Sequence, residues 1–115
     1  MLLENGIRFS NAIVRTPCLR INEGITTADI GKPDYQKALQ QHMQYVSTLT
    51  NCGLNVTIME SDNDFPDSTF VEDVAVLTEK CAIVTSPGAP TRKGEELKVE
   101  KLLKNFYYDK IERIA

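Results

Sequence analysis

Apolar side chains recur with two different periods along the chain, and the changes of period mark the predicted elements. Residues 8–16 are rich in β-branched and aromatic side chains and predict a first strand, which Pro17 ends. From Asp34 to about residue 51, apolar residues recur at three- and four-residue steps, which predicts an amphipathic helix. Its apolar face consists of Tyr35, Ala38, Leu39, His42, Tyr45, Val46 and Leu49. Residues 54–59 alternate and predict a second strand.

The second half of the chain repeats this mixture of periods. Short apolar runs at residues 74–77 and 82–84 predict an antiparallel hairpin, and the Pro/Gly-rich residues 86–94 predict a loop without regular structure. A helix is expected over residues 95–106, because its acids come first and its lysines follow, as the helix dipole favours. Its predicted buried stripe is Val99, Leu102, Leu103 and Phe106. Residues 110–115 alternate again, so the pattern as a whole predicts an α/β fold that ends in a strand.

Composition adds limits to this picture. A chain of 115 residues with ordinary apolar and charged fractions predicts one globular domain. The net charge of −3 is spread along the sequence, which argues against a nucleic-acid face and against binding to an anionic membrane surface. No stretch approaches the ~20 apolar residues of a membrane span, and the N-terminus has an acid where a signal peptide has bases.

The cysteines indicate the compartment. Cys18, Cys52 and Cys81 are odd in number and lack Cys-x-x-Cys spacing, so neither a disulfide framework nor a zinc site is expected. A reduced, cytoplasmic location is the natural expectation. His42 is the only histidine and lies on the apolar helix stripe, where a packing role is more common than a catalytic one. No convincing pair of nucleophile and base follows from these residues.

Carboxylates concentrate in one stretch between the second strand and the hairpin, at Asp62, Asp64, Asp67, Glu72 and Asp73. A calcium loop starting at Asp62 would need Gly at its sixth position and Glu at its twelfth, where the chain has Asp67 and Asp73, so calcium is excluded. An organic cation fits better, since planar carboxylates match a guanidinium bidentately.

Two features of this stretch stay open at the level of sequence. Glu72 and Asp73 interrupt a strand-like run, and in an extended segment they point to opposite sides, so both serve one ligand only if the strand ends or bulges there. Glu72 could equally pair with a surface lysine while Asp67 and Asp73 cap turns. Arg92, in the Pro/Gly-bounded loop, either clamps a carboxylate or is solvated.

Several separate motifs resemble, in order, the dimethylarginine dimethylaminohydrolase family of the guanidino-group-modifying (pentein) superfamily. The motifs are residues 14–17 (Val-Arg-Thr-Pro), 24–27 (Gly-Ile-Thr-Thr), 31–35 (Gly-Lys-Pro-Asp-Tyr), 65–73 (Phe-Pro-Asp-Ser-Thr-Phe-Val-Glu-Asp) and 81–89 (Cys-Ala-Ile-Val-Thr-Ser-Pro-Gly-Ala), followed by Arg92. The resemblance implies a five-bladed α/β propeller built of ββαβ-type units, with residues 1–115 as the N-terminal portion of a single catalytic domain.

The resemblance also implies an activity and a set of substrate-binding residues. The family reaction is attack by a cysteine thiolate on the guanidinium carbon of an Nω-methylated arginine, loss of an alkylamine, and hydrolysis of the covalent intermediate to citrulline, without a metal or an organic cofactor. Asp67, Glu72 and Asp73 match the family's acidic substrate residues, with Asp73 expected against the guanidinium. Arg92 matches an arginine that holds the substrate α-carboxylate, and Ile25 matches an apolar pocket residue that is usually leucine.

Family enzymes are considerably longer, and their catalytic histidine and nucleophilic cysteine match no residue of this chain. We therefore expect an incomplete enzyme that is inactive alone and could associate with a second copy through exposed sheet edges. An arginine deiminase acting on unmethylated arginine is one alternative, and a non-catalytic module for arginine-like cations is another.

Overall fold

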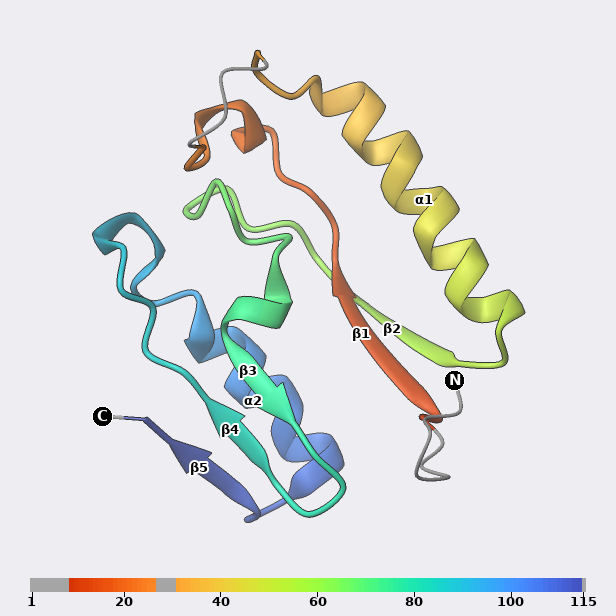
Figure 1. The fold of residues 1–115 in the computed structure, drawn as a ribbon, viewed down its shortest axis with the longest axis vertical. Helices are drawn as coiled ribbons and strands as arrows, with labels where there is room; N and C mark the ends of the chain where they lie inside the picture. Colours follow the sequence, from red (N-terminus) through yellow and green to blue (C-terminus); the bar gives the residue numbers. More distant parts are fainter. Residues whose placement is uncertain (1–8, 27–30, 115) are drawn as a thin grey trace. The chain divides into compact units, whose positions relative to one another are not determined.

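The computed structural model describes residues 9–26 and 31–114, which form two compact units, one within residues 1–69 and one within residues 70–115 (Figure 1). Each unit pairs a small sheet with one helix. The observed order of strands and helices is the one that the apolar periods predict, and the mixed α/β class is confirmed.

The first unit is a β–α–β arrangement. Strand β1 (Asn11–Arg15) pairs in parallel with β2 (Asn55–Met59), and helix α1 (Tyr35–Asn51) lies between them in sequence (Figure 1). Parallel neighbours need a crossover of a dozen or more residues, and α1 provides it. The predicted first strand is confirmed as the shorter β1, and Arg8, its predicted first residue, lies outside the described residues.

Helix α1 begins and ends where its sequence signals predict. The Asp34 side chain accepts a hydrogen bond from the backbone N–H of Lys37 at 3.0 Å and so caps the first turn. Gly53 follows the helix with a positive φ of 89°, a conformation that favours glycine. None of the residues of α1 is fully buried, and Tyr45 of the predicted apolar face is exposed.

The second unit is a ββαβ arrangement. Strands β3 (Ala75–Leu77) and β4 (Ala82–Val84) form the predicted antiparallel hairpin, and β5 (Ile111–Arg113) pairs in parallel with β4 (Figure 1). Helix α2 (Glu96–Tyr107) connects β4 to β5 in sequence and packs on the sheet. The core of this unit consists of Val74, Ala82, Val84, Val99 and Leu103.

Two details of the second unit differ from the predictions. Phe106 is 37% exposed, so the buried stripe of α2 is narrower than its periodicity predicts. The Pro/Gly-rich segment is not wholly irregular, because Pro90–Arg92 forms one turn of 3-10 helix in which proline supplies the starting φ. Within the described residues, no helix has the length and apolar character that crossing a membrane requires.

Candidate functional site

The acidic stretch begins in a compact loop that is tied to β1. The Thr69 hydroxyl donates to the carbonyl of Arg15 at 2.8 Å, and the buried Arg15 donates through Nε to the carbonyl of Glu60 at 3.2 Å. Residues 60 and 69 are therefore both fixed against the end of the same strand. The loop between them is thus anchored at both ends.

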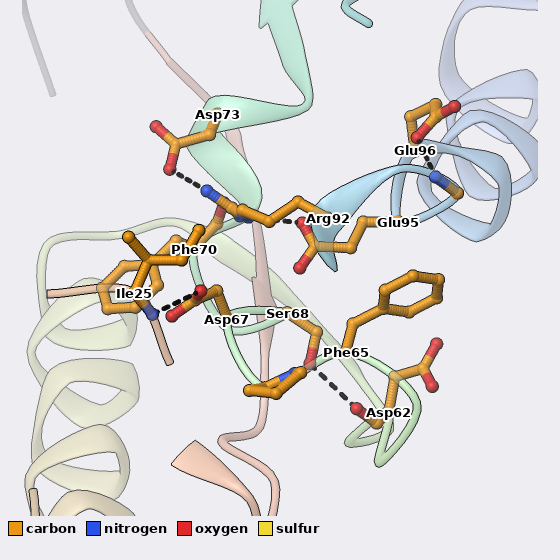
Figure 2. Close-up of polar contacts among 12 residues, drawn as sticks. Ile25, Asp62, Phe65, Asp67, Ser68, Phe70, Asp73, Arg92, Glu95 and Glu96 are labelled. Carbon is orange, nitrogen blue, oxygen red and sulfur yellow. Dashed lines mark hydrogen bonds and ion pairs between the residues drawn. The ribbon is translucent and has the colours of Figure 1, made fainter. Parts of the chain in front are cut away.

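The inside of this loop is organised around Asp62. Its carboxylate accepts from the backbone N–H of Asp64 at 3.1 Å, a side-chain turn typical of Asp. Its carbonyl accepts from the Ser68 hydroxyl at 3.2 Å (Figure 2). Both Asp62 and Ser68 are buried. Asp62 therefore supports the loop, a role that the sequence alone left undecided.

Asp67 and Ile25 are brought together within the first unit. The Asp67 carboxylate accepts from the backbone N–H of Ile25 at 3.0 Å (Figure 2). Asp67 is 7% exposed, whereas Ile25 is 57% exposed and turns its side chain outward. The segment that carries Ile25 is thus held by its backbone, and its apolar side chain is accessible.

Glu72 and Asp73 are not part of a strand, which corrects the strand-like interpretation of this run. They lie in a 3-10 turn, Val71–Asp73, and strand β3 begins only at Ala75. The turn is held from the residue that follows β4, because the Thr85 hydroxyl donates to the Asp73 carbonyl at 2.7 Å. Because neither acid lies in an extended segment, the alternation that would point them to opposite sides does not apply. Glu72 and Asp73 are both exposed.

Arg92 lies at the centre of the second unit's polar contacts. Its Nη1 donates to Asp73 Oδ2 at 2.7 Å, its Nε to Glu95 Oε2 at 2.7 Å, and its Nη2 to the carbonyl of Phe70 at 3.2 Å (Figure 2). The side chain is 14% exposed, so the interpretation of Arg92 as a solvated loop residue is wrong. Burial opposes its charge, but the hydrogen bonds to Asp73 and Glu95 outweigh this effect and raise the pKa of Arg92 above its ordinary value.

Glu95 is the residue of this cluster that the sequence did not reveal. It was predicted only as an acid of the first helical turn, yet it is 2% exposed and pairs with Arg92. The available signal was the three-residue spacing from Arg92 to Glu95. That spacing is common on exposed helix starts, so it does not distinguish a buried pair from a solvated one.

The cysteines and the histidine differ in exposure. Cys18 is buried and its thiol lies 3.6 Å from the carbonyl of Phe65, whereas Cys52 is exposed after α1. His42 is half-buried on α1, where burial lowers its pKa. Within the residues that the structure describes, no three His, Cys, Asp or Glu side chains are grouped to hold a metal ion.

Known proteins with similar sequences include two dimethylarginine dimethylaminohydrolases. The family model described as "N,N dimethylarginine dimethylhydrolase, eukaryotic" matches residues 26–114. The N(G),N(G)-dimethylarginine dimethylaminohydrolase of Pseudomonas aeruginosa is 45% identical over 106 residues, and that of Streptomyces coelicolor is 38% identical over 91 residues. These alignments cover 92% and 78% of this chain but 42% and 35% of the relatives, so the chain spans less than half their length.

Solved structures give the same result at the level of the fold. The P. aeruginosa enzyme, in a mutant complexed with citrulline, superimposes with a TM-score of 0.93 at 44% identity. The match covers 95% of this chain and 43% of the enzyme's chain. A dimethylarginine dimethylaminohydrolase adduct with S-methyl-L-thiocitrulline superimposes with a TM-score of 0.92 at 44% identity, and the match covers 94% of this chain and 42% of the adduct's chain. AgrE, in a complex with ornithine and NAD+, shares the fold with a TM-score of 0.74 at 15% identity, covering 90% of this chain and 16% of AgrE.

Proposed function

This chain belongs to the dimethylarginine dimethylaminohydrolase family, and from that premise we propose that its protein hydrolyses Nω-methylated arginine to citrulline and an alkylamine. A thiolate adds to the guanidinium carbon, the alkylamine leaves with a proton, and water then releases citrulline and restores the thiol. The relatives named above carry this enzyme's name, and one of them binds citrulline.

The observation that carries the proposal is the cluster of Arg92, Asp73 and Glu72 in one small unit. Arg92 already holds a carboxylate oxygen at 2.7 Å, the contact that a substrate α-carboxylate would make with it. Asp73, which is 55% exposed on its side chain, is free to turn to a substrate guanidinium, with Glu72 adjacent. Substrate binding would then break the Arg92–Asp73 ion pair and form two new ones, between Arg92 and the α-carboxylate and between Asp73 and the guanidinium.

Asp67 and Ile25, which lie in the first unit, are proposed to contact the substrate as well. Asp67 fixes the backbone at Ile25, which leaves the Ile25 side chain 57% exposed for contact with the aliphatic or amine end of the substrate. We also propose that residues 1–115 are the N-terminal portion of one catalytic domain with a five-bladed propeller fold, in the cytoplasm. The ββαβ order of the second unit supports the proposed propeller fold.

The nucleophile is proposed to lie outside Cys18, Cys52 and Cys81. An attacking thiolate needs an accessible, electropositive setting. Cys18 is 1% exposed, and Cys81 lies in the hairpin turn with its sulfur 3.8 Å from the Thr78 hydroxyl. The 115-residue chain alone should therefore release no citrulline, and turnover by the purified chain would contradict this assignment.

The test is citrulline release from Nω-methylarginine by the full-length protein that contains this chain. We expect activity in the wild type and a loss of about a hundredfold or more in kcat/KM for Asp73→Asn, since the contact of Asp73 with the substrate guanidinium loses its charge. Full activity in Asp73→Asn would overturn the role of Asp73. Preference for unmethylated arginine would identify an arginine deiminase instead, and ligand binding without turnover would identify a binding module.

A further inference from the structure

The buried carboxylate of Glu95 is the least expected group in the second unit. Its side chain is 1% exposed, and an ionised carboxylate is costly to bury unless it is paired. Glu95 lies immediately before α2, where the helix dipole favours a negative charge, and its Oε2 accepts from Arg92 Nε at 2.7 Å. The fold therefore keeps a negative charge in its interior, beside the Arg92 guanidinium.

Asp73 and Glu95, which both bind Arg92, differ in exposure. The side chain of Asp73 is 55% exposed and that of Glu95 is 1% exposed, although both lie 2.7 Å from a guanidinium nitrogen. An exposed partner can be exchanged for another anion at small cost, whereas removing a buried partner leaves a buried charge uncompensated. Asp73 is thus the exchangeable partner of Arg92, and Glu95 is the permanent one.

We propose that Glu95 is a positioning residue that holds the Arg92 guanidinium in a fixed orientation, with its Nη1 side presented to the substrate α-carboxylate. The proposal rests on the proposed function, in which Arg92 binds that carboxylate. Glu95 occupies Nε and the Phe70 carbonyl occupies Nη2, so two sides of the guanidinium stay anchored while the Asp73 contact at Nη1 is exchanged. Donors that are already held in the binding orientation lose less conformational entropy when they bind a ligand.

The same helix offers a matched control. Glu100 also binds an arginine, since its two carboxylate oxygens accept from Arg113 Nε at 2.7 Å and from Arg113 Nη2 at 2.6 Å. Arg113 is half exposed and is not among the residues proposed to bind substrate. Glu100→Gln therefore removes an Arg–carboxylate pair from α2 without touching Arg92.

The experiment compares Glu95→Gln, Glu95→Asp and Glu100→Gln in the full-length protein, using steady-state turnover of Nω-methylarginine. We expect Glu95→Gln to raise KM about tenfold or more while kcat changes less than about threefold, because ground-state binding of the carboxylate is lost. Glu95→Asp keeps the charge and should recover part of that loss. Glu100→Gln should leave both constants unchanged.

A second substrate makes the readout specific. The decarboxylated analogue of Nω-methylarginine has no carboxylate for Arg92, so its kcat/KM should change less than about threefold in Glu95→Gln. Equal losses on both substrates, an unchanged KM for Nω-methylarginine, or loss of folding in both Glu95 variants would overturn the positioning role. A wild type without turnover of Nω-methylarginine would instead overturn the proposed function itself.

Discussion

The carboxylate of Asp67 lies where a side chain on residue 24 would have to be. Gly24 adopts an extended conformation that any residue can adopt, with φ of −67° and ψ of 165°. Its constraint is therefore one of space. A Cβ there would collide with Asp67 Oδ1 and lie 3.2 Å from the carbonyl of Ile21. The absence of a side chain at Gly24 is what allows Asp67 to reach the backbone of Ile25.

Gly24→Ala should therefore destabilise the first unit. The added methyl group must displace the Asp67 carboxylate, which weakens its hydrogen bond to Ile25, and we expect a loss of about 1–3 kcal/mol in the free energy of unfolding. Urea unfolding of the protein measures this loss. Gly88→Ala is the matched control, because no heavy atom lies within 4 Å of its added Cβ, and its effect should stay within about 0.5 kcal/mol. Equal effects of the two substitutions would contradict the steric argument.

Helix α1 carries the only histidine of the sequence on its half-buried face. The His42 ring lies beside Tyr45, with ring centroids 6.4 Å apart. Burial lowers the pKa of His42 below its ordinary value of 6.5, so the folded chain binds the proton less readily than the unfolded chain does. The stability that neutral His42 contributes is present above pH 6.5 and is lost as the pH falls through the unfolded and then the folded pKa.

Proton NMR tests this directly, because a single histidine gives a single imidazole titration curve. We expect its midpoint below 6.5. His42→Gln should correspondingly weaken the loss of stability between about pH 7.5 and pH 5.5, the range over which an ordinary histidine titrates. A midpoint at or above 6.5 would show that the imidazole is not desolvated on α1.

The elements were predictable wherever one period persists over a whole segment. α1, α2 and the β3–β4 hairpin follow from three- and four-residue steps or from short apolar runs bounded by turn residues. The 3-10 turn at Val71–Asp73 was not predictable, since its apolar neighbours favour a strand. Contacts from Thr85, which lies twelve residues further on, hold that turn, and a local pattern contains no information about them.

The sequence predicted which residues belong to the candidate site better than it predicted how they are arranged. The motifs drew attention to Asp67, Glu72, Asp73 and Arg92, and the structure joins Asp73 to Arg92. Burial of Glu95 depends on how α2 packs on its sheet, and residue type and spacing alone do not determine that packing. The role of each side chain toward a substrate remains a prediction that the kinetic experiments test.

At the scale of the whole chain, the described residues form two small sheets rather than one large one, with strand orders β1-β2 and β3-β4-β5. Parallel sheets are normally covered on both faces, but β1 and β2 form a parallel pair in which Ile58 is 55% exposed. The outer hairpin strand β3 also exposes Val76 and Leu77. Exposed strands with apolar side chains favour pairing with another chain.

We therefore expect the isolated 115-residue chain to self-associate as its concentration rises, with sedimentation velocity as the measurement. Ile58→Lys should reduce the association, because a charge on an exposed strand opposes strand pairing. Leu97→Lys is the matched control, since Leu97 is similarly exposed, at 56%, but lies on α2 and not on a strand. If the chain stays monomeric throughout, or if both lysine variants associate equally weakly, the exposed strands are not what drives association. If only Ile58→Lys dissociates the chain, the surface around β2 is one that a partner chain covers.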